Sequence, residues 1–146
     1  MNDTFATPFA RTCSNERELE SVAVELAAML RPGDVVAISG PLGSGKTAFV
    51  RAIVRALHGV DQGTSPTFTF RHRYDGTPPI EHLDFYRIGE RDDVAELGLE
   101  EAFGGDAIVL VEWWRNAPSL LPARRWEVHL EGSGETPRAV TIASPR

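Results

Sequence analysis

Eight residues, Gly40 to Thr47, read Gly-Pro-Leu-Gly-Ser-Gly-Lys-Thr and fit the phosphate-binding pattern G-x-x-x-x-G-K-[ST] at every position. Its glycines allow consecutive backbone N–H groups to turn inward and form a concavity that binds an anion. Lys46 is expected to reach the β- and γ-phosphates of a nucleotide, and the Thr47 hydroxyl to ligate Mg²⁺. The pattern therefore predicts binding of a nucleoside triphosphate by Gly40, Leu42, Gly43, Ser44, Gly45, Lys46 and Thr47.

Lys46 is the only lysine among the 15 basic residues of the chain. A slim ammonium can reach between two phosphates, whereas a broad guanidinium would fit the same loop badly. The alternative is a glycine-rich turn that caps an ordinary helix. The flanks favour the nucleotide, because residues 35–39 form a short apolar run typical of a buried strand and residues 48–57 form an amphipathic, helix-compatible segment.

Two acidic residues stand where a phosphate loop needs a carboxylate. Glu112 ends the apolar run 108–111, and Asp84 ends the run 80–83. Acids at the carboxyl ends of buried strands face the nucleotide in folds of this kind. Either acid could hold Mg²⁺, directly or through water, and either could orient the attacking water, so the two roles stay undivided. We predict Lys46, Asp84 and Glu112 as the catalytic residues; the alternative for each acid is a solvated strand end or a helix N-cap.

Three further features lie near these residues. Ser65 and Thr67 belong to a hydroxyl-rich segment that is either a switch sensing the γ-phosphate or a polar turn. His82 precedes Asp84 by two residues, which permits a metal pair, although a packed or hydrogen-bonding histidine is the expected role. Trp113 and Trp114 follow Glu112; one is expected in the core and the other against the nucleotide or a partner protein.

The elements that must position these residues indicate an α/β fold. The pattern predicts one domain over residues 1–146, with a P-loop NTPase-like mixed sheet that has central parallel strands, antiparallel hairpins and flanking helices. Asn15 and Glu18 resemble a capping box at the start of the first helix. The expected strands are 5–11, 35–39, 67–74, 80–85, 107–111, 126–130 and 139–143, and the expected helices are 16–30, 48–57 and 91–103, the last interrupted by Gly98.

Composition narrows the class of protein. A chain that is 42% apolar and 25% charged is ordinary for a soluble globular protein. It has no apolar stretch near the roughly 20 residues that span a bilayer, and its first residues lack a signal-peptide pattern. The lone Cys13 excludes an intramolecular disulfide and a cysteine-rich zinc site. We therefore expect a cytoplasmic protein without membrane contact.

The net charge of −6 argues against a broad nucleic-acid surface, which normally requires a clustered basic stripe. We expect no DNA binding, and any RNA to be held mainly by another protein.

The order of the motifs is specific enough to suggest a family. In sequence order these motifs are Gly40–Thr47, Ser65-Pro66-Thr67-Phe68-Thr69, His82-Leu83-Asp84-Phe85-Tyr86-Arg87, Glu96-Leu97-Gly98 and Val111-Glu112-Trp113. This order resembles the TsaE family, the P-loop ATPase of bacterial tRNA threonylcarbamoyladenosine biosynthesis. The resemblance extends from about residue 14 to residue 130.

The resemblance implies a weak, Mg²⁺-dependent ATPase that works with a two-protein threonylcarbamoyl-transferase complex. That complex modifies the adenosine beside the tRNA anticodon, and the ATPase resets it between turnovers. The residues implicated are Lys46 at the phosphates, Thr47 and Glu112 at Mg²⁺, Asp84 at metal or water, Ser65 and Thr67 in a switch-like segment, Trp113 close to the site, and Asn15 and Arg138 near the adenine pocket.

One position departs from the family pattern. The family usually continues Val-Glu-Trp with proline, whereas this chain has Trp114 and Arg115. Because proline would fix the backbone there and tryptophan does not, the loop after Glu112 is expected to differ.

Three other functions can be weighed against the residues. A small-molecule kinase would need an arginine-rich lid, and residues 89–105 are short and acidic for one. A GTP switch is excluded, because its N-K-x-D motif requires a second lysine. The third alternative is a binding module whose nucleotide is structural; slow hydrolysis alone does not exclude it, whereas hydrolysis stimulated by a partner does.

Overall fold

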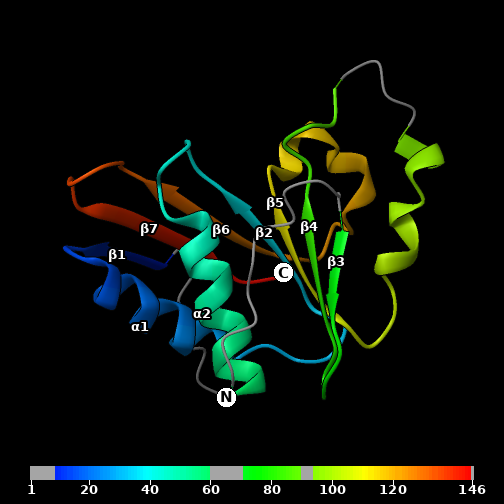
Figure 1. Ribbon diagram of the computed structural model, residues 1–146, viewed down its shortest axis with the longest axis horizontal. Helices are drawn as coiled ribbons and strands as arrows, with labels where there is room; N and C mark the ends of the chain where they lie inside the picture. The colour runs from blue at the N-terminus through cyan, green and yellow to red at the C-terminus, as the bar shows by residue number, and fades with distance from the viewer. Residues whose placement is uncertain (1–8, 60–70, 90–93, 146) are drawn as a thin grey trace.

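The computed structural model describes residues 9–59, 71–89 and 94–145. Within these ranges a seven-stranded mixed sheet has the order β1-β7-β6-β2-β5-β4-β3, as Figure 1 shows. Its strands are β1 (Phe9–Cys13), β2 (Val35–Ser39), β3 (Arg71–Tyr74), β4 (Ile80–Asp84), β5 (Ile108–Glu112), β6 (Trp126–Glu131) and β7 (Arg138–Ala143). Its helices are α1 (Glu16–Ala27) and α2 (Lys46–His58), with the 3₁₀ turns η1 (Val94–Leu97), η2 (Leu99–Ala102), η3 (Trp114–Asn116) and η4 (Pro118–Leu120).

The centre of the sheet is parallel and its two edges are antiparallel. Strand β2 pairs in parallel with β5 and β6, and β4 pairs in parallel with β5. The hairpins β3–β4 and β6–β7 and the pair β1–β7 are antiparallel. The predicted α/β mixed sheet is therefore confirmed. The carboxyl ends of the parallel strands β2, β4 and β5 lie together at one end of the sheet, which is where ligands bind in sheets of this type.

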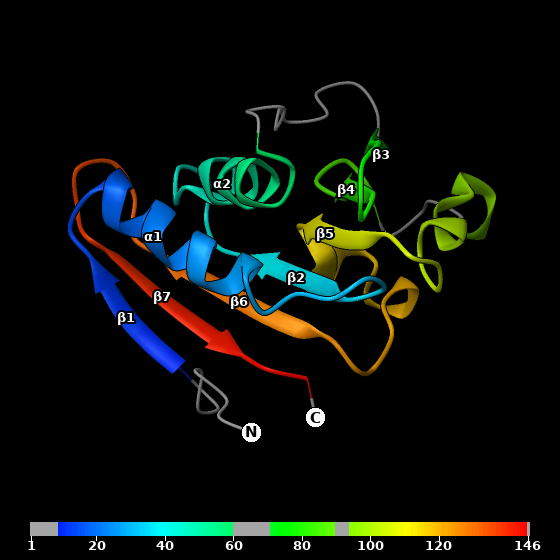
Figure 2. The ribbon, with the colours of Figure 1, turned by 90° about the horizontal axis from the view of Figure 1, so that it is seen from below.

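Two apolar clusters sit on the two faces of the sheet. Figure 2 shows α1 and α2 on the same face. The first cluster lies under these helices and contains Leu26, Phe49 and Ile53 together with Ile38 and Leu110 of the central strands. The second lies on the opposite face and includes side chains of β2, β4 and β5 with those of the 3₁₀ turns: Val35, Ala37, Leu83, Val109, Val111, Leu99, Ala102 and Trp114. The central strands are buried on both faces, so they read as continuous apolar runs.

Several predicted elements have ends shifted by one or two residues in the structure, and three differences have a clear physical cause. The first helix ends at Ala27 rather than Leu30, because the N–H groups of Met29 and Leu30 turn back to the carbonyls three residues earlier. The predicted helix 91–103 is wrong over its described part: η1 and η2 are separated by Gly98, whose φ of 67° breaks helical geometry. The first described strand runs to Cys13 rather than Arg11, because β1 pairs with β7 as far as Arg138.

Candidate functional site

The phosphate loop connects β2 directly to α2. Gly45 is the N-cap of α2 with φ of 100°, a backbone conformation that favours glycine. Gly40 has a second reason to lack a side chain, because a Cβ there would lie 2.5 Å from the Leu130 carbonyl oxygen and 2.7 Å from Ser44 Oγ. The strand, loop and helix predicted around residues 40–47 are therefore observed, and α2 directs its N-terminus at the loop.

Lys46 folds back onto its own loop. Its Nζ donates to the carbonyl oxygens of Gly40 at 2.6 Å and Pro41 at 2.9 Å, and it lies 4.4 Å from the centre of the Trp113 ring. The residue is only 6% exposed. Burial lowers the pKa of Lys46, while the nearby carboxylates of Glu112 and Asp84 act in the opposite direction. The lysine, the tryptophan and both predicted acids therefore share one site.

The two acids stand side by side at the carboxyl ends of neighbouring parallel strands. In the β4–β5 register Asp84 lies opposite Glu112. Glu112 is buried, and Asp84 is half-buried and accepts a hydrogen bond at 2.9 Å from the Tyr86 N–H. Burial is the main cause that raises the pKa of Asp84, and the Glu112 carboxylate raises it further. Two partly desolvated carboxylates at one strand edge form a site that a cation would stabilise.

His82 lies on β4, two residues before Asp84, and its side chain contacts Glu112. Its Nε2 is 2.6 Å from Glu112 Oε2, and both side chains are almost completely buried. Within the described chain, His82 Nδ1 has no hydrogen-bond partner. The expected role of a hydrogen-bonding histidine is therefore observed, and its partner is Glu112 rather than Asp84, two residues along the same strand.

The segment after β5 closes one side of the site. Trp113 has φ of 57°, an uncommon left-handed conformation for a residue other than glycine, and its ring lies 4.9 Å from that of Tyr86. Asn116 donates from Nδ2 to the Phe85 carbonyl oxygen at 2.9 Å, so it ties this segment to the one after β4. Sequence reasoning missed Asn116 and Tyr86 as contributors, because a contact between two loops has no local signal.

Trp114 occupies the position where the family pattern has proline. Its side chain is buried in the second apolar cluster, with the guanidinium groups of Arg115 and Arg125 at 5.0 Å and 4.7 Å from its ring centre. It is also the first residue of η3. One tryptophan in the core and one at the site is the division that the sequence predicted for this pair.

Asn15 and Arg138 line one cavity beside the phosphate loop. The cavity measures about 470 Å³, and its other lining residues come from the end of β1, the start of α1, the start of α2 and the β6–β7 turn. Asn15 Oδ1 caps α1 by accepting from the Glu18 N–H at 2.9 Å, which confirms the predicted cap. The guanidinium of Arg138 donates to backbone carbonyl oxygens of the loop and of the turn. The structure thus joins the two residues that the resemblance implied near an adenine pocket.

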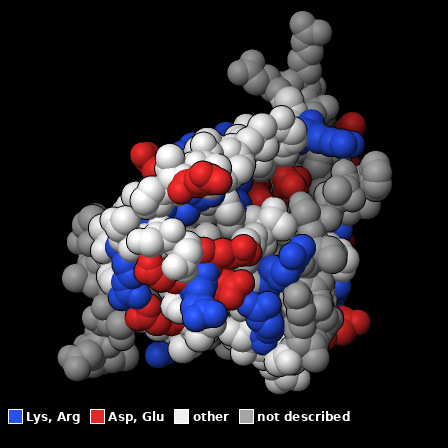
Figure 3. All heavy atoms as spheres, turned by 60° about the vertical axis from the view of Figure 1, so that its left-hand side comes forward, with Lys and Arg blue, Asp and Glu red and all other residues white. Residues whose placement is uncertain are grey.

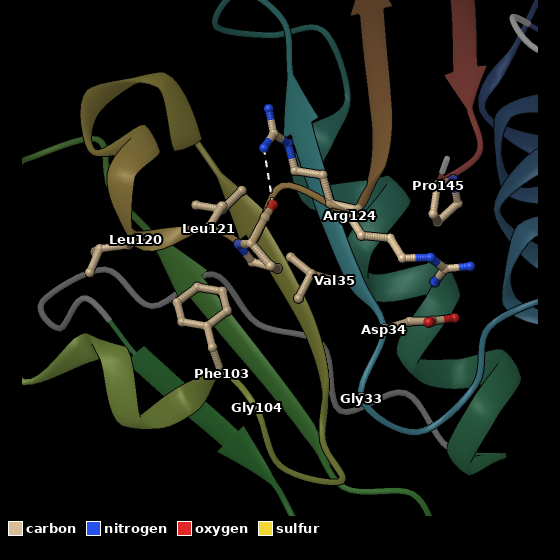
Figure 4. Close-up of a pocket in the computed structure, with 11 residues that line it drawn as sticks. Gly33, Asp34, Val35, Phe103, Gly104, Leu120, Leu121, Arg124 and Pro145 are labelled. Carbon is tan, nitrogen blue, oxygen red and sulfur yellow. Dashed lines mark hydrogen bonds between the residues drawn. The ribbon is translucent and has the colours of Figure 1, made fainter.

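A second cavity of similar volume, about 490 Å³, lies at the opposite end of the sheet, where β2 begins. Figure 4 shows its apolar floor of Val35, Leu121 and Phe103, with the Arg124 side chain extending toward Asp34 and Pro145. None of the predicted site residues lines this cavity. The chemistry-bearing residues of the described chain gather at the other edge of the sheet.

The donors available for a metal suit Mg²⁺. The Thr47 hydroxyl and the carboxylates of Asp84 and Glu112 offer only oxygen, the ligand atom that Mg²⁺ prefers. Among the described residues, no three His, Cys, Asp or Glu side chains form a ready cluster for a metal ion. A magnesium ion here would need phosphate oxygens and water to complete its shell, as is usual for Mg²⁺ beside a nucleotide. The predicted switch residues Ser65 and Thr67 lie outside the described residues.

Comparison with known proteins gives one consistent result. Residues 13–140 match the family described as "Threonylcarbamoyl adenosine biosynthesis protein TsaE". Proteins named tRNA threonylcarbamoyladenosine biosynthesis protein TsaE are similar to this chain: the one from Bacillus subtilis is 36% identical over 89% of this chain and 82% of its own length. The one from Treponema pallidum is 32% identical over 79% of this chain and 85% of its own length.

A solved structure supports the same relationship. The crystal structure of YdiB from Bacillus subtilis superposes with a TM-score of 0.78 at 32% identity, covering 95% of this chain and 86% of that one. The family match, the relatives and the fold agree with the family resemblance that the motif order suggested. This chain therefore belongs to the TsaE family.

Proposed function

We propose that this chain binds ATP with Mg²⁺ and hydrolyses it slowly, in the service of threonylcarbamoyl modification of the tRNA adenosine beside the anticodon. Its nucleotide cycle would reset a two-protein transferase complex between turnovers. The observation that carries the proposal is the gathering of Lys46, Asp84, Glu112 and Trp113 at the phosphate loop. Family membership supplies the pathway, because the relatives are named for threonylcarbamoyladenosine biosynthesis.

The division of labour follows from burial and position. Lys46, the lone lysine, would leave its carbonyl partners and bind the β- and γ-phosphate oxygens. Bound Mg²⁺ would neutralise charge that develops on the phosphates, and Thr47, Asp84 and Glu112 would hold it. Glu112, which is buried and hydrogen-bonded to His82, would orient the attacking water.

Asp84 would act from the edge of the site. It is half-buried and its pKa is raised by burial, so a cation beside it would offset the cost of burying its charge. This makes Asp84 the better candidate for contact with metal or metal-bound water. Glu112, its neighbour on β5, therefore need not both contact the metal and orient the attacking water.

The partner requirement rests on what the surface offers. On the face drawn in Figure 3, acidic and basic side chains are interspersed rather than gathered into one basic stripe. With a net charge of −6, we infer that the partner complex holds most of the tRNA. We also infer that residues 1–146 act as one domain and that the protein works in the cytoplasm, where tRNA and ATP meet. None of the helices in the described ranges is both long and apolar enough to cross a bilayer.

The test is the rate of Mg·ATP hydrolysis by the purified chain, alone and with the transferase pair. We expect a low rate that rises several-fold with the pair, and no Mg·ATP binding by Lys46→Ala. Arg124→Ala is a matched control, because it removes one positive charge at the far end of the sheet. A rate indifferent to the pair would remove the partner-gated role, and acceptor-dependent ADP production would favour a small-molecule kinase.

A further inference from the structure

Arg138, at the start of β7, makes an unusual set of hydrogen bonds to the phosphate loop. Its Nε donates to the Ser44 carbonyl oxygen at 2.9 Å, and its Nη2 donates to the Gly43 carbonyl oxygen at 3.1 Å. The two residues lie 94 and 95 positions earlier in the chain. One planar guanidinium thus binds two consecutive peptide groups of the loop, which suits its fixed fork of N–H donors.

The same side chain is anchored to the turn between β6 and β7. Arg138 Nη2 also donates to the Gly134 carbonyl oxygen at 3.0 Å, and Nη1 donates to the Thr136 carbonyl oxygen. Thr136 Oγ1 holds this turn by donating to the Ser133 carbonyl oxygen at 2.6 Å and accepting from the Ser133 N–H at 3.0 Å. Arg138 therefore connects a braced turn to the phosphate loop.

These contacts fix the direction of two backbone N–H groups. In a trans peptide the C=O and N–H bonds point in opposite directions. When the guanidinium holds the carbonyls of Gly43 and Ser44 on its side, the N–H groups of Ser44 and Gly45 point away from it. The Ser44 N–H accordingly points toward the Pro41 carbonyl oxygen at 3.1 Å, which also accepts from Lys46 Nζ. The Ser44 N–H and Lys46 Nζ thus face the same side of the loop.

We propose that Arg138 is a positioning residue that pre-forms the phosphate concavity from outside, by holding the Gly43 and Ser44 peptide groups. This role rests on the proposed nucleotide-binding function and differs from a contact with adenine. It also differs from simple attraction between a positive charge and phosphate, because four backbone carbonyl oxygens already engage the guanidinium.

The test measures the affinity of Arg138→Gln and Arg138→Lys for two ligands, by titration calorimetry in the presence of Mg²⁺. ATP carries a base and ribose, whereas inorganic tripolyphosphate carries neither. If Arg138 shapes the loop, both variants lose affinity for both ligands by a similar factor, about tenfold, the loss expected for charge-assisted hydrogen bonds. Arg124→Gln, an exposed arginine at the far cavity, keeps the affinities of the parent protein.

Other outcomes overturn the proposal. Lost affinity for ATP alone would make Arg138 a nucleoside contact, and recovery by lysine would make it a simple charge. Unchanged affinity in both variants would remove any role in binding. Failure of the proposed function is distinguishable, because in that case the parent chain would not bind Mg·ATP or Lys46→Ala would bind it normally.

A second variant covers the case in which replacing Arg138 prevents folding. Thr136→Val removes the hydroxyl that braces the turn and leaves Arg138 in place. We expect it to weaken ATP and tripolyphosphate binding in parallel, by a smaller factor than Arg138→Gln would. Parent-like affinity for both ligands in a folded Thr136→Val protein would count against the coupling of turn and loop.

Discussion

Two buried glutamates on neighbouring strands have opposite surroundings. Glu81 of β4 has no exposed surface, and it accepts from Arg71 at 2.6 and 3.0 Å and from Arg73 at 3.1 Å. Glu112 of β5 is equally buried, but its described hydrogen-bond partner is the imidazole of His82. One carboxylate is compensated by two arginine cations, and the other by a hydrogen bond with a single imidazole.

On the proposed function, this difference separates a structural acid, Glu81, from a functional one, Glu112. Burying a charge is costly unless a partner offsets it, and Glu81 has its partners within the fold. Glu112 stands beside Asp84 with Lys46 as the nearby cation, and Lys46 Nζ is bonded to loop carbonyls instead. On the proposed function, Mg·ATP would bring the cation that completes this site. Buried charge alone would not have distinguished the two glutamates.

Glu112→Gln gives the largest expected effect. The amide keeps the shape of the side chain but cannot serve as an anionic ligand or base, so we expect hydrolysis to fall by about 100-fold or more. Mg·ATP binding should survive. Single-turnover rates and titration calorimetry separate the two effects, and unchanged turnover would remove Glu112 from the site.

Glu81→Ala should instead lower the stability of the fold and leave nucleotide binding unchanged. It leaves Arg71 and Arg73 without their buried partner, and because both arginines are 30–50% exposed, we expect a loss of about 2 kcal/mol in unfolding free energy rather than more. ATP affinity of the folded protein should not change. Denaturant unfolding measures the first and calorimetry the second; a catalytic defect without a stability loss would reverse our assignment.

His82 tests whether the imidazole serves Glu112. In His82→Leu the carboxylate loses its hydrogen bond, and we expect hydrolysis to fall by about tenfold, a typical cost of removing a supporting hydrogen bond at an active site. His82→Gln can still donate to Glu112 and should recover part of the rate. Equal rates in the two variants would show that the hydrogen bond does not matter. Thermal unfolding of both proteins controls for packing.

Asp84→Asn gives the smallest of these expected effects, a pH-dependent increase in the free energy of unfolding. Burial raises the pKa of Asp84, so the folded chain binds this proton more tightly than the unfolded chain, and the ionised carboxylate costs stability at neutral pH. Without Mg²⁺ or nucleotide, the variant should therefore be more stable at pH 7, by less than about 1 kcal/mol. The gain should shrink as the pH falls toward the ordinary Asp value of 3.8. A gain that grows on acidification would contradict this sign.

The local elements of the site could be predicted because short stretches of sequence encode them. The loop between β2 and α2 depends on glycine geometry, and the cap at Asn15 depends on a side chain and an N–H three residues apart. Apolar runs placed β2 and β5 in the centre of the sheet. The same reasoning placed Glu112 and Asp84 at strand ends, which the register brings opposite each other.

Tertiary contacts account for what could not be predicted. The bond from His82 to Glu112 depends on the register of β4 and β5, and the target of Arg138 lies more than 90 residues away. The segment 91–103 has the composition of a helix, yet Gly98 divides its described part into two 3₁₀ turns that pack against the sheet. For His82 and Arg138, partners from distant parts of the chain determined the outcome, and for residues 94–102 the backbone conformation of Gly98 did.

The inward fold of Lys46 has a thermodynamic consequence. Because its ammonium already binds the Gly40 and Pro41 carbonyls and lies against the Trp113 ring, a phosphate bound as we propose would compete with the protein's own backbone. The apparent dissociation constant then equals the intrinsic one divided by the fraction of molecules in which the lysine is released. Any partner that favours the released state would tighten nucleotide binding without touching the nucleotide.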